Sequence, residues 1–105
     1  MNLIEAVIHN NRLEVEQCLT AGTDPNACQD AANVTPLHFA AQHNATDVIS
    51  LLIAAGANIY ARTVPDGQTP LEVAKLNGHE EMVALLQTYI QKLPYKEDLD
   101  DWDHS

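Results

Sequence analysis

The sequence predicts an all-α solenoid of stacked helix-turn-helix units joined by loops that resemble β-hairpins. Three observations lead to this fold class. The chain repeats itself, since Thr69-Pro70-Leu71 lies 34 positions after Thr35-Pro36-Leu37. Each Thr-Pro pair opens a short apolar pattern, and a second, aliphatic run follows it. A period in the low thirties is typical of arrays in which each helical unit buries its apolar face against its neighbours.

The first helix of each unit has a clear start signal. Thr35 and Thr69 are good N-cap residues, and the proline after each suits the first helical position, where a missing N–H costs nothing. Leu37, Ala40 and Ala41 are spaced i, i+3, i+4, which places them on one helical face. Small residues on that face predict that neighbouring first helices approach closely.

A second helix and a projecting loop complete each unit. After a break at Asn44, or at Asn77-Gly78, aliphatic runs occupy residues 48–53 and 82–86. Gly56, and Gly22 in the first unit, stand where a helix ends in a left-handed residue. Residues 24–34 and 58–68 are rich in turn formers. They predict projecting loops or short β-hairpins between the units.

In these features the sequence resembles the ankyrin repeat family. Residues 35–41, Thr-Pro-Leu-His-Phe-Ala-Ala, and residues 48–58 follow the family pattern, and residues 66–71 and 77–79 follow it in the next unit. The resemblance covers about residues 3–93. It implies an ankyrin repeat domain at 1–93, with repeats at about 1–34, 35–68 and 69–93, followed by an acidic tail at 94–105.

The first and third units depart from the family pattern. The first lacks the Thr-Pro start and carries Asn10 where glycine is usual. The third has Glu72 where the family prefers histidine, and no glycine ends its second helix. We expect these units to be the N- and C-terminal caps, because the ends of a solenoid need a polar outer side.

Length and charge narrow the function classes. The chain has 105 residues, the size of one domain, with 15 acidic residues against 5 Lys and Arg and a net charge of −10. The negative net charge opposes direct binding to nucleic acid and to anionic membranes, and it favours encounter with a basic partner. No segment is apolar enough to span a bilayer, and acids near the N-terminus argue against a secretory signal.

Cys18 and Cys28 are expected to be free thiols, so we expect a cytoplasmic protein.

No catalytic residue and no cofactor are predicted. The chain lacks the phosphate-binding, dinucleotide-binding and HExxH spacings and the Gly-x-Ser-x-Gly elbow, and its only serines are Ser50, inside a helix, and Ser105. We give little weight to a Cys–His pair, because no histidine is spaced to serve either cysteine. By the family resemblance, His38 and His79 are expected to have structural roles, with His38 hydrogen-bonded to backbone between units.

His9 and His43 invite a metal interpretation, because they occupy equivalent positions in adjacent units. Neighbouring helices pack about 10 Å apart, so a shared metal would need a third ligand, and none is evident. We therefore predict no metal site and interpret both histidines as contact residues.

The resemblance implies that the exposed loops and first helices form a concave face that binds another protein. The alternative is that these are tolerated surface residues, since scattered exposed apolar groups are ordinary. Tyr60 has its own alternative, which is to pack under the second loop. The predicted contact residues are Ala31, Ala32 and Val34 in the first loop; Pro65, Asp66 and Gln68 in the second loop, flanked by Tyr60 and Arg62; and Ile8, His9, Gln42, His43, Leu76 and Asn77 on the first helices.

The tail, residues 94–105, has too few apolar residues to fold alone, which favours disorder. The alternative is a contact role for Leu99 and Trp102, three apart among acids, on a basic groove or on the last repeat.

Three functions remain open. The first is a non-enzymatic protein-interaction module that uses the concave face. The second is an acidic inhibitor of the immunity or antitoxin type that neutralises a basic partner. Salt-sensitive binding that weakens when Asp100, Asp101 and Asp103 are neutralised would favour it. The third is a translocated effector with an acidic C-terminal signal, for which deletion of residues 94–105 would abolish export.

Overall fold

The structure, a computed structural model, describes residues 2–28 and 32–92. In chain order its elements are α1 (Leu3–Ile8), α2 (Arg12–Thr20), α3 (Pro36–Gln42), the 3-10 helix η1 (Thr46–Val48), α4 (Ile49–Ala54), α5 (Pro70–Leu76) and α6 (Glu80–Lys92). No strand is assigned within the described ranges, so the all-α prediction is confirmed and the connecting segments are loops without β-pairing.

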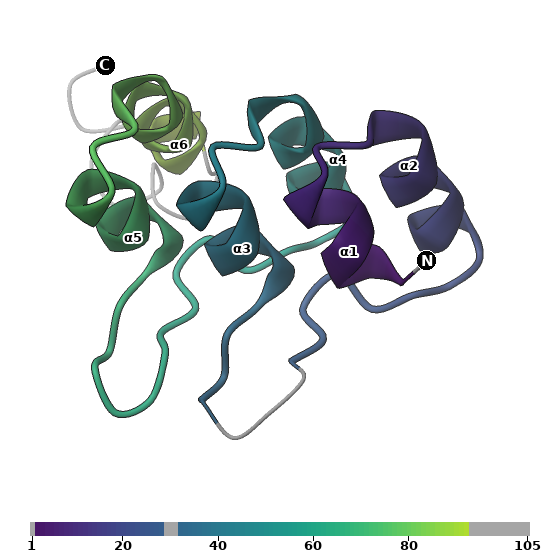
Figure 1. The fold of residues 1–105 in the computed structure, drawn as a ribbon, viewed down its shortest axis with the longest axis horizontal. Helices are drawn as coiled ribbons and strands as arrows, with labels where there is room; N and C mark the ends of the chain where they lie inside the picture. Colours follow the sequence, from purple (N-terminus) through teal and green to yellow (C-terminus); the bar gives the residue numbers. More distant parts are fainter. Residues whose placement is uncertain (1, 29–31, 93–105) are drawn as a thin grey trace, which may run out of the picture.

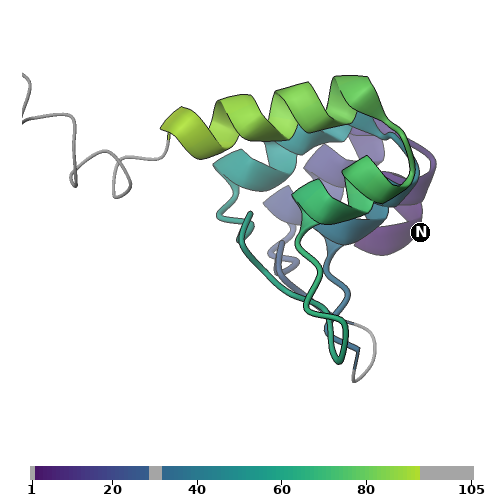
Figure 2. The ribbon, with the colours of Figure 1, turned by 90° about the vertical axis from the view of Figure 1, so that its left-hand side faces the viewer.

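The helices form two rows (Figure 1). α1, α3 and α5 lie side by side in one row, and α2, α4 and α6 form the second row behind it. The loops that precede α3 and α5 leave the helices on the same side, away from α6 (Figure 2). Loops and front-row helices therefore share one side of the molecule, as the predicted concave face requires.

Reciprocal capping bonds fix where the front-row helices begin. In α5, Thr69 Oγ1 accepts the Glu72 N–H at 3.3 Å, and Glu72 Oε1 accepts the Thr69 N–H at 3.1 Å. Asn2 does the same for α1, where its Oδ1 accepts the Glu5 N–H at 2.8 Å. The first unit therefore lacks the Thr-Pro pair but keeps a capping box made from other residues.

The turn between the paired helices needs a left-handed residue in every unit. Asn10, Asn44 and Gly78 take this place, with φ values of 53°, 55° and 71°. Asn10, where glycine is usual, also bonds across to the second unit. Its Nδ2 donates to Asp47 Oδ2 at 3.1 Å, and its Oδ1 accepts the Asp47 N–H at 3.2 Å. The departure at Asn10 keeps the required backbone and adds a link between repeats.

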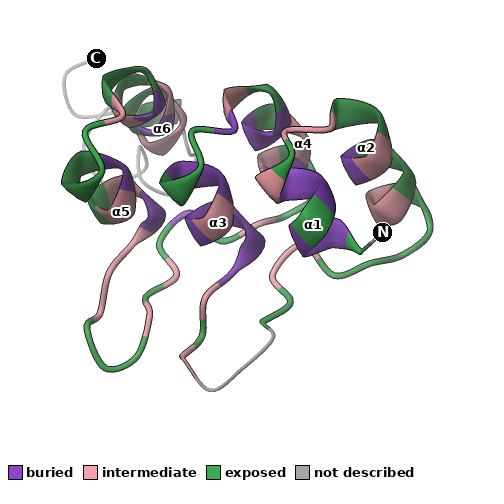
Figure 3. Ribbon diagram, in the orientation of Figure 1, coloured by how far each residue is buried: buried purple, intermediate pink, exposed green. Residues whose placement is uncertain are grey.

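The core lies between the two rows and runs through all three units (Figure 3). Its largest fully buried aliphatic side chains include Leu37, Ile49 and Leu52. Ala40 and Ala74 are also completely buried in the front row, where α3 packs against α1 and α5. The predicted small-residue face is confirmed, and it lets these helices approach closely.

Both ends of the stack are more polar than its middle. In α2 only Val15 is buried, and Glu16 and Gln17 are exposed. In α5, Lys75 is exposed at the position that corresponds to the fully buried Ala41 of α3. These polar outer sides are what the expected caps require. No helix in the part of the chain that the structure describes is both long and apolar enough to cross a bilayer.

Candidate functional site

His38 joins α3 to the second loop. Its Nδ1 accepts the backbone N–H of Thr35 at 3.0 Å, so Nε2 carries the proton and donates to the Gln68 carbonyl oxygen at 2.7 Å. The side chain is 2% exposed, and burial lowers the pKa of His38 below 6.5, although hydrogen bonds to the backbone of Gln68 and Ala61 oppose that shift. His38 thus bonds to backbone as expected, at Gln68, the last residue of the loop that leads from the second repeat to the third.

His79 makes a corresponding bond from the third unit. Its Nε2 lies 3.0 Å from the carbonyl oxygen of Gln42, at the end of α3. A carbonyl oxygen only accepts, so Nε2 donates here as well. Two histidines thus hold the main chains at Gln42 and Gln68, which are both predicted contact residues.

The second loop is closed by its own hydrogen bonds. Thr63 N–H donates to the Gln68 carbonyl at 3.0 Å, and Gln68 N–H donates to Thr63 Oγ1 at 3.1 Å. Gly67, whose φ is 68°, donates its N–H to the Thr63 carbonyl at 2.7 Å. Together these bonds fix the direction in which the side chains at the loop tip project.

The two loops are also bonded to each other. Val64 N–H donates to the Ala32 carbonyl at 2.8 Å, and Asn33 Nδ2 donates to the Arg62 carbonyl at 2.7 Å. Asn33 has a left-handed backbone with φ 60°, a conformation that asparagine tolerates better than most residues. The loops are therefore a paired structure on one side of the stack.

A hollow of about 200 Å³ lies where α3, α5 and the loops meet, and we call it the central hollow. It brings together four predicted contact residues from separate elements. Its lining is Val34, His38, Gln42, Thr63, Gln68, Val73 and Asn77. Asn77 Nδ2 donates to the Val73 carbonyl at 2.8 Å. Within residues 2–28 and 32–92, the side-chain amides of Gln42 and Gln68 make no hydrogen bond, so both can donate to and accept from a partner.

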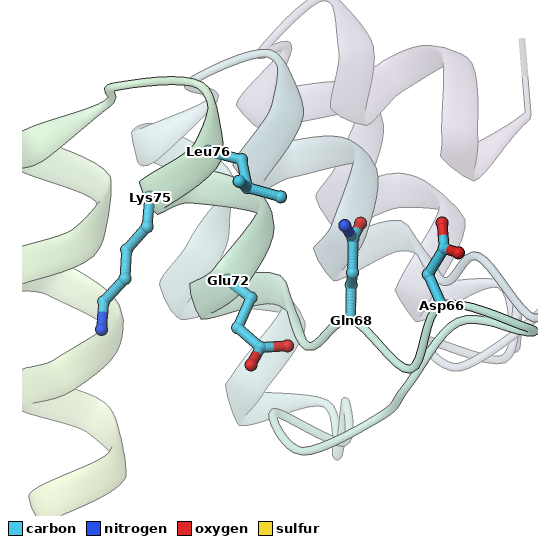
Figure 4. Close-up of a pocket in the computed structure, with 5 residues that line it drawn as sticks. All are labelled: Asp66, Gln68, Glu72, Lys75 and Leu76. Carbon is cyan, nitrogen blue, oxygen red and sulfur yellow. The ribbon is translucent and has the colours of Figure 1, made fainter.

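A second hollow, of about 370 Å³, adjoins the first, and we call it the lateral hollow (Figure 4). Its lining is Asp66, Gln68, Glu72, Lys75 and Leu76, so Gln68 belongs to both hollows. Sequence reasoning missed Glu72 and Lys75 here, and Thr63 and Val73 in the central hollow. A usable signal existed for Glu72, because it lies four residues before Leu76 and so shares a helical face with it.

Tyr60 and Arg62 line a separate hollow of about 460 Å³ together with Asn26, Asn33 and Asn58. Tyr60 is 38% exposed. Arg62 Nη1 donates to the Gly67 carbonyl at 3.0 Å, which ties the guanidinium to its own loop. The structure therefore does not bring these two residues into the hollows that Gln68 lines.

The remaining predicted residues lie outside these three hollows. His9, His43 and Pro65 are exposed, and Ile8 and Ala32 are half-buried. Ala31 lies outside the described residues, as do Leu99 and Trp102 of the tail. Among the described residues, no group of three or more His, Cys, Asp or Glu is placed to hold a metal ion. Neither the half-buried Cys18 nor the exposed Cys28 forms a disulfide bond among the described residues.

Comparison with known proteins bears on this architecture. A family model described as ankyrin repeats, in three copies, matches residues 3–96. The chain belongs to the ankyrin repeat family. Ankyrin repeats are protein-interaction modules.

Two relatives of this ankyrin chain are much longer than the chain itself, and their names differ from each other. The 2-5A-dependent ribonuclease of Mus musculus is 40% identical over 73 residues, which are 70% of this chain and 10% of that protein. Glycerophosphocholine phosphodiesterase gde1 of Schizosaccharomyces pombe is 38% identical over 74 residues, 70% of this chain and 6% of that protein. The chain thus spans a small fraction of either relative.

Proposed function

We propose that this ankyrin domain is a non-enzymatic module that binds a protein partner through the concave face formed by its loops and front-row helices. One observation carries the proposal. The free side-chain amides of Gln42 and Gln68, which come from a helix and from a loop, line one hollow with the apolar Val34 and Val73. A small apolar surface with a few convergent polar groups is what specific recognition of a protein segment needs.

The way the backbone is held supports the same function. His79 and His38 hold the main chains of Gln42 and Gln68, and the loops are bonded to each other through Val64 and Ala32. Ordering a rotamer-rich side chain on binding costs about 0.5–1.5 kcal/mol, and ordering a mobile loop adds to that cost. A backbone fixed before binding avoids part of this loss.

A non-enzymatic role agrees with the chemistry of the histidine at the centre of the site. Both ring nitrogens of His38 are engaged by backbone groups of Thr35 and Gln68, which leaves no lone pair of this ring free to take a proton from a substrate. Cys18 and Cys28 form no disulfide bond with each other, which fits a reducing compartment, and we include a cytoplasmic location in the proposal.

Affinity capture with a matched control tests the proposal. The double variant Gln42→Arg/Gln68→Arg places bulky charge in the central hollow. The control, Gln17→Arg/Gln91→Arg, makes the same chemical change at exposed positions on α2 and α6. We expect mass spectrometry to find proteins that the intact chain and the control retain and the first variant loses. If all three chains retain the same proteins, binding does not use this face.

A further inference from the structure

We propose that the lateral hollow receives an arginine or lysine side chain from an extended, basic segment of the protein partner. This inference rests on the proposed function and adds the chemistry of the group that is bound. The apolar surface of Leu76 and the carboxylates of Asp66 and Glu72 line the same hollow.

The side chains of this hollow point to two sides in Figure 4. Asp66 and Gln68 project from the second loop toward the same side, and Leu76 reaches toward them from the end of α5. Glu72 and Lys75 point the opposite way, and Lys75 lies farther from the loop than Glu72 does. Asp66 is the charged side chain drawn on the side toward which Gln68 and Leu76 point, so a group docked there meets negative charge.

Both carboxylates retain acceptor capacity. Glu72 Oε1 accepts the N–H of Thr69 at 3.1 Å, and the other carboxylate oxygen takes no part in this capping bond. The exposed Asp66 side chain makes no hydrogen bond or ion pair within the described ranges. Carboxylates accept strong, charge-assisted hydrogen bonds from guanidinium and ammonium groups. The net charge of −10 adds a long-range attraction for such a segment.

Leu76 distinguishes a basic side chain from a small cation. It is 71% exposed at the end of α5 and lines the lateral hollow. Arginine and lysine lay their methylene stems along apolar surface while the charged group remains at a polar edge. A stem over Leu76 with its charge toward Asp66 satisfies both features, whereas a free metal ion would use only the carboxylates.

The central hollow accounts for the main chain of the docked segment. It meets the lateral hollow at Gln68 and is lined there by uncharged groups. The free amides of Gln42 and Gln68 can pair with the N–H and C=O groups that an extended peptide exposes on its edge. The neutral hollow therefore suits backbone, and the acidic one suits the basic side chain next to it.

A displayed library of random twelve-residue peptides, selected against the intact chain, tests the chemistry while the partner is still unidentified. We expect enriched peptides with an arginine or lysine beside an aliphatic residue. A synthetic peptide from that set should bind at least tenfold more weakly, by fluorescence anisotropy, to Asp66→Asn/Glu72→Gln. Binding to Glu81→Gln, an exposed acid on α6, should be unchanged. Both changes are isosteric, and glutamine still completes the capping box of α5.

The outcomes separate this inference from the proposed function. Enrichment of neutral or acidic peptides whose binding is lost in Gln42→Arg/Gln68→Arg overturns the basic preference and leaves the concave face as the binding surface. Basic peptides that bind equally to the intact chain and to Asp66→Asn/Glu72→Gln also overturn the inference, because another part of the chain then recognises their charge. A selection that enriches no peptide overturns it too.

Discussion

The Nε2 atom of His38 donates a hydrogen bond to the carbonyl oxygen of Gln68, 2.7 Å away, in the loop that leads to the third repeat. One buried side chain thereby connects the cap of α3, through Thr35, to a residue that lines both hollows. Stability of the repeat and geometry of the candidate binding face depend on the same ring.

The free energy of unfolding should fall as the pH drops below about 6.5, the ordinary pKa of histidine. Burial lowers the pKa of His38 in the folded chain, so in this range the unfolded chain binds more protons. The contribution of His38 to the free energy of unfolding is complete above about pH 6.5. It is lost as the pH falls toward the pKa of His38 in the folded chain, with a slope of at most ~1.4 kcal/mol per pH unit.

Urea unfolding at several pH values measures this slope. In His38→Gln the slope due to this residue should disappear, together with part of the stability at neutral pH. The exposed His9 provides a control as His9→Gln, which should behave as the unchanged chain does. Equal slopes in His38→Gln and the unchanged chain would show that another group is responsible.

Asn10→Ala should lower the free energy of unfolding more than Asn10→Gly does. Asn10→Gly keeps the left-handed turn but loses the two bonds to Asp47, at a cost of about 1 kcal/mol. Asn10→Ala adds a left-handed backbone penalty of roughly 1–2 kcal/mol. Asn44→Gly should be neutral or stabilising, because φ is 55° there. Denaturant titration of the three variants ranks them, and an Asn10→Ala as stable as Asn10→Gly would contradict this account.

Two leucines test where the core lies. Leu52 is fully buried, so Leu52→Ala should reduce the free energy of unfolding by about 2–5 kcal/mol. Leu13 is 62% exposed on α2, and the same change there should cost well under half of that. Thermal unfolding followed by circular dichroism compares the pair. Similar losses of stability at both sites would contradict this assignment of the core, because Leu13 would then be buried against another part of the protein.

The bonds between the loops should control local opening. Asn33→Gly keeps a residue suited to φ 60° and removes the bond from Asn33 Nδ2 to the Arg62 carbonyl. The amide proton of Val64, which bonds to the Ala32 carbonyl, should then exchange faster with solvent. Hydrogen exchange by NMR would detect this, with the buried amide of Leu52 as an internal reference for global unfolding. An unchanged Val64 rate would show that Asn33 does not hold the loops together.

Local signals in the sequence determined the repeats, the helix starts and the buried alanine face. They did so because N-caps, helical spacing and left-handed turn positions act within a few residues of one another, as at Thr69 and Glu72. Which loop residues share a surface was decided only in three dimensions. Gln68 meets Gln42 and Val34 in one hollow, whereas Arg62 lines another. The position of the loops on the stack follows from bonds between segments that are distant in the sequence, such as Asn33 to Arg62 and His38 to Gln68, and no short pattern in the sequence specifies those bonds.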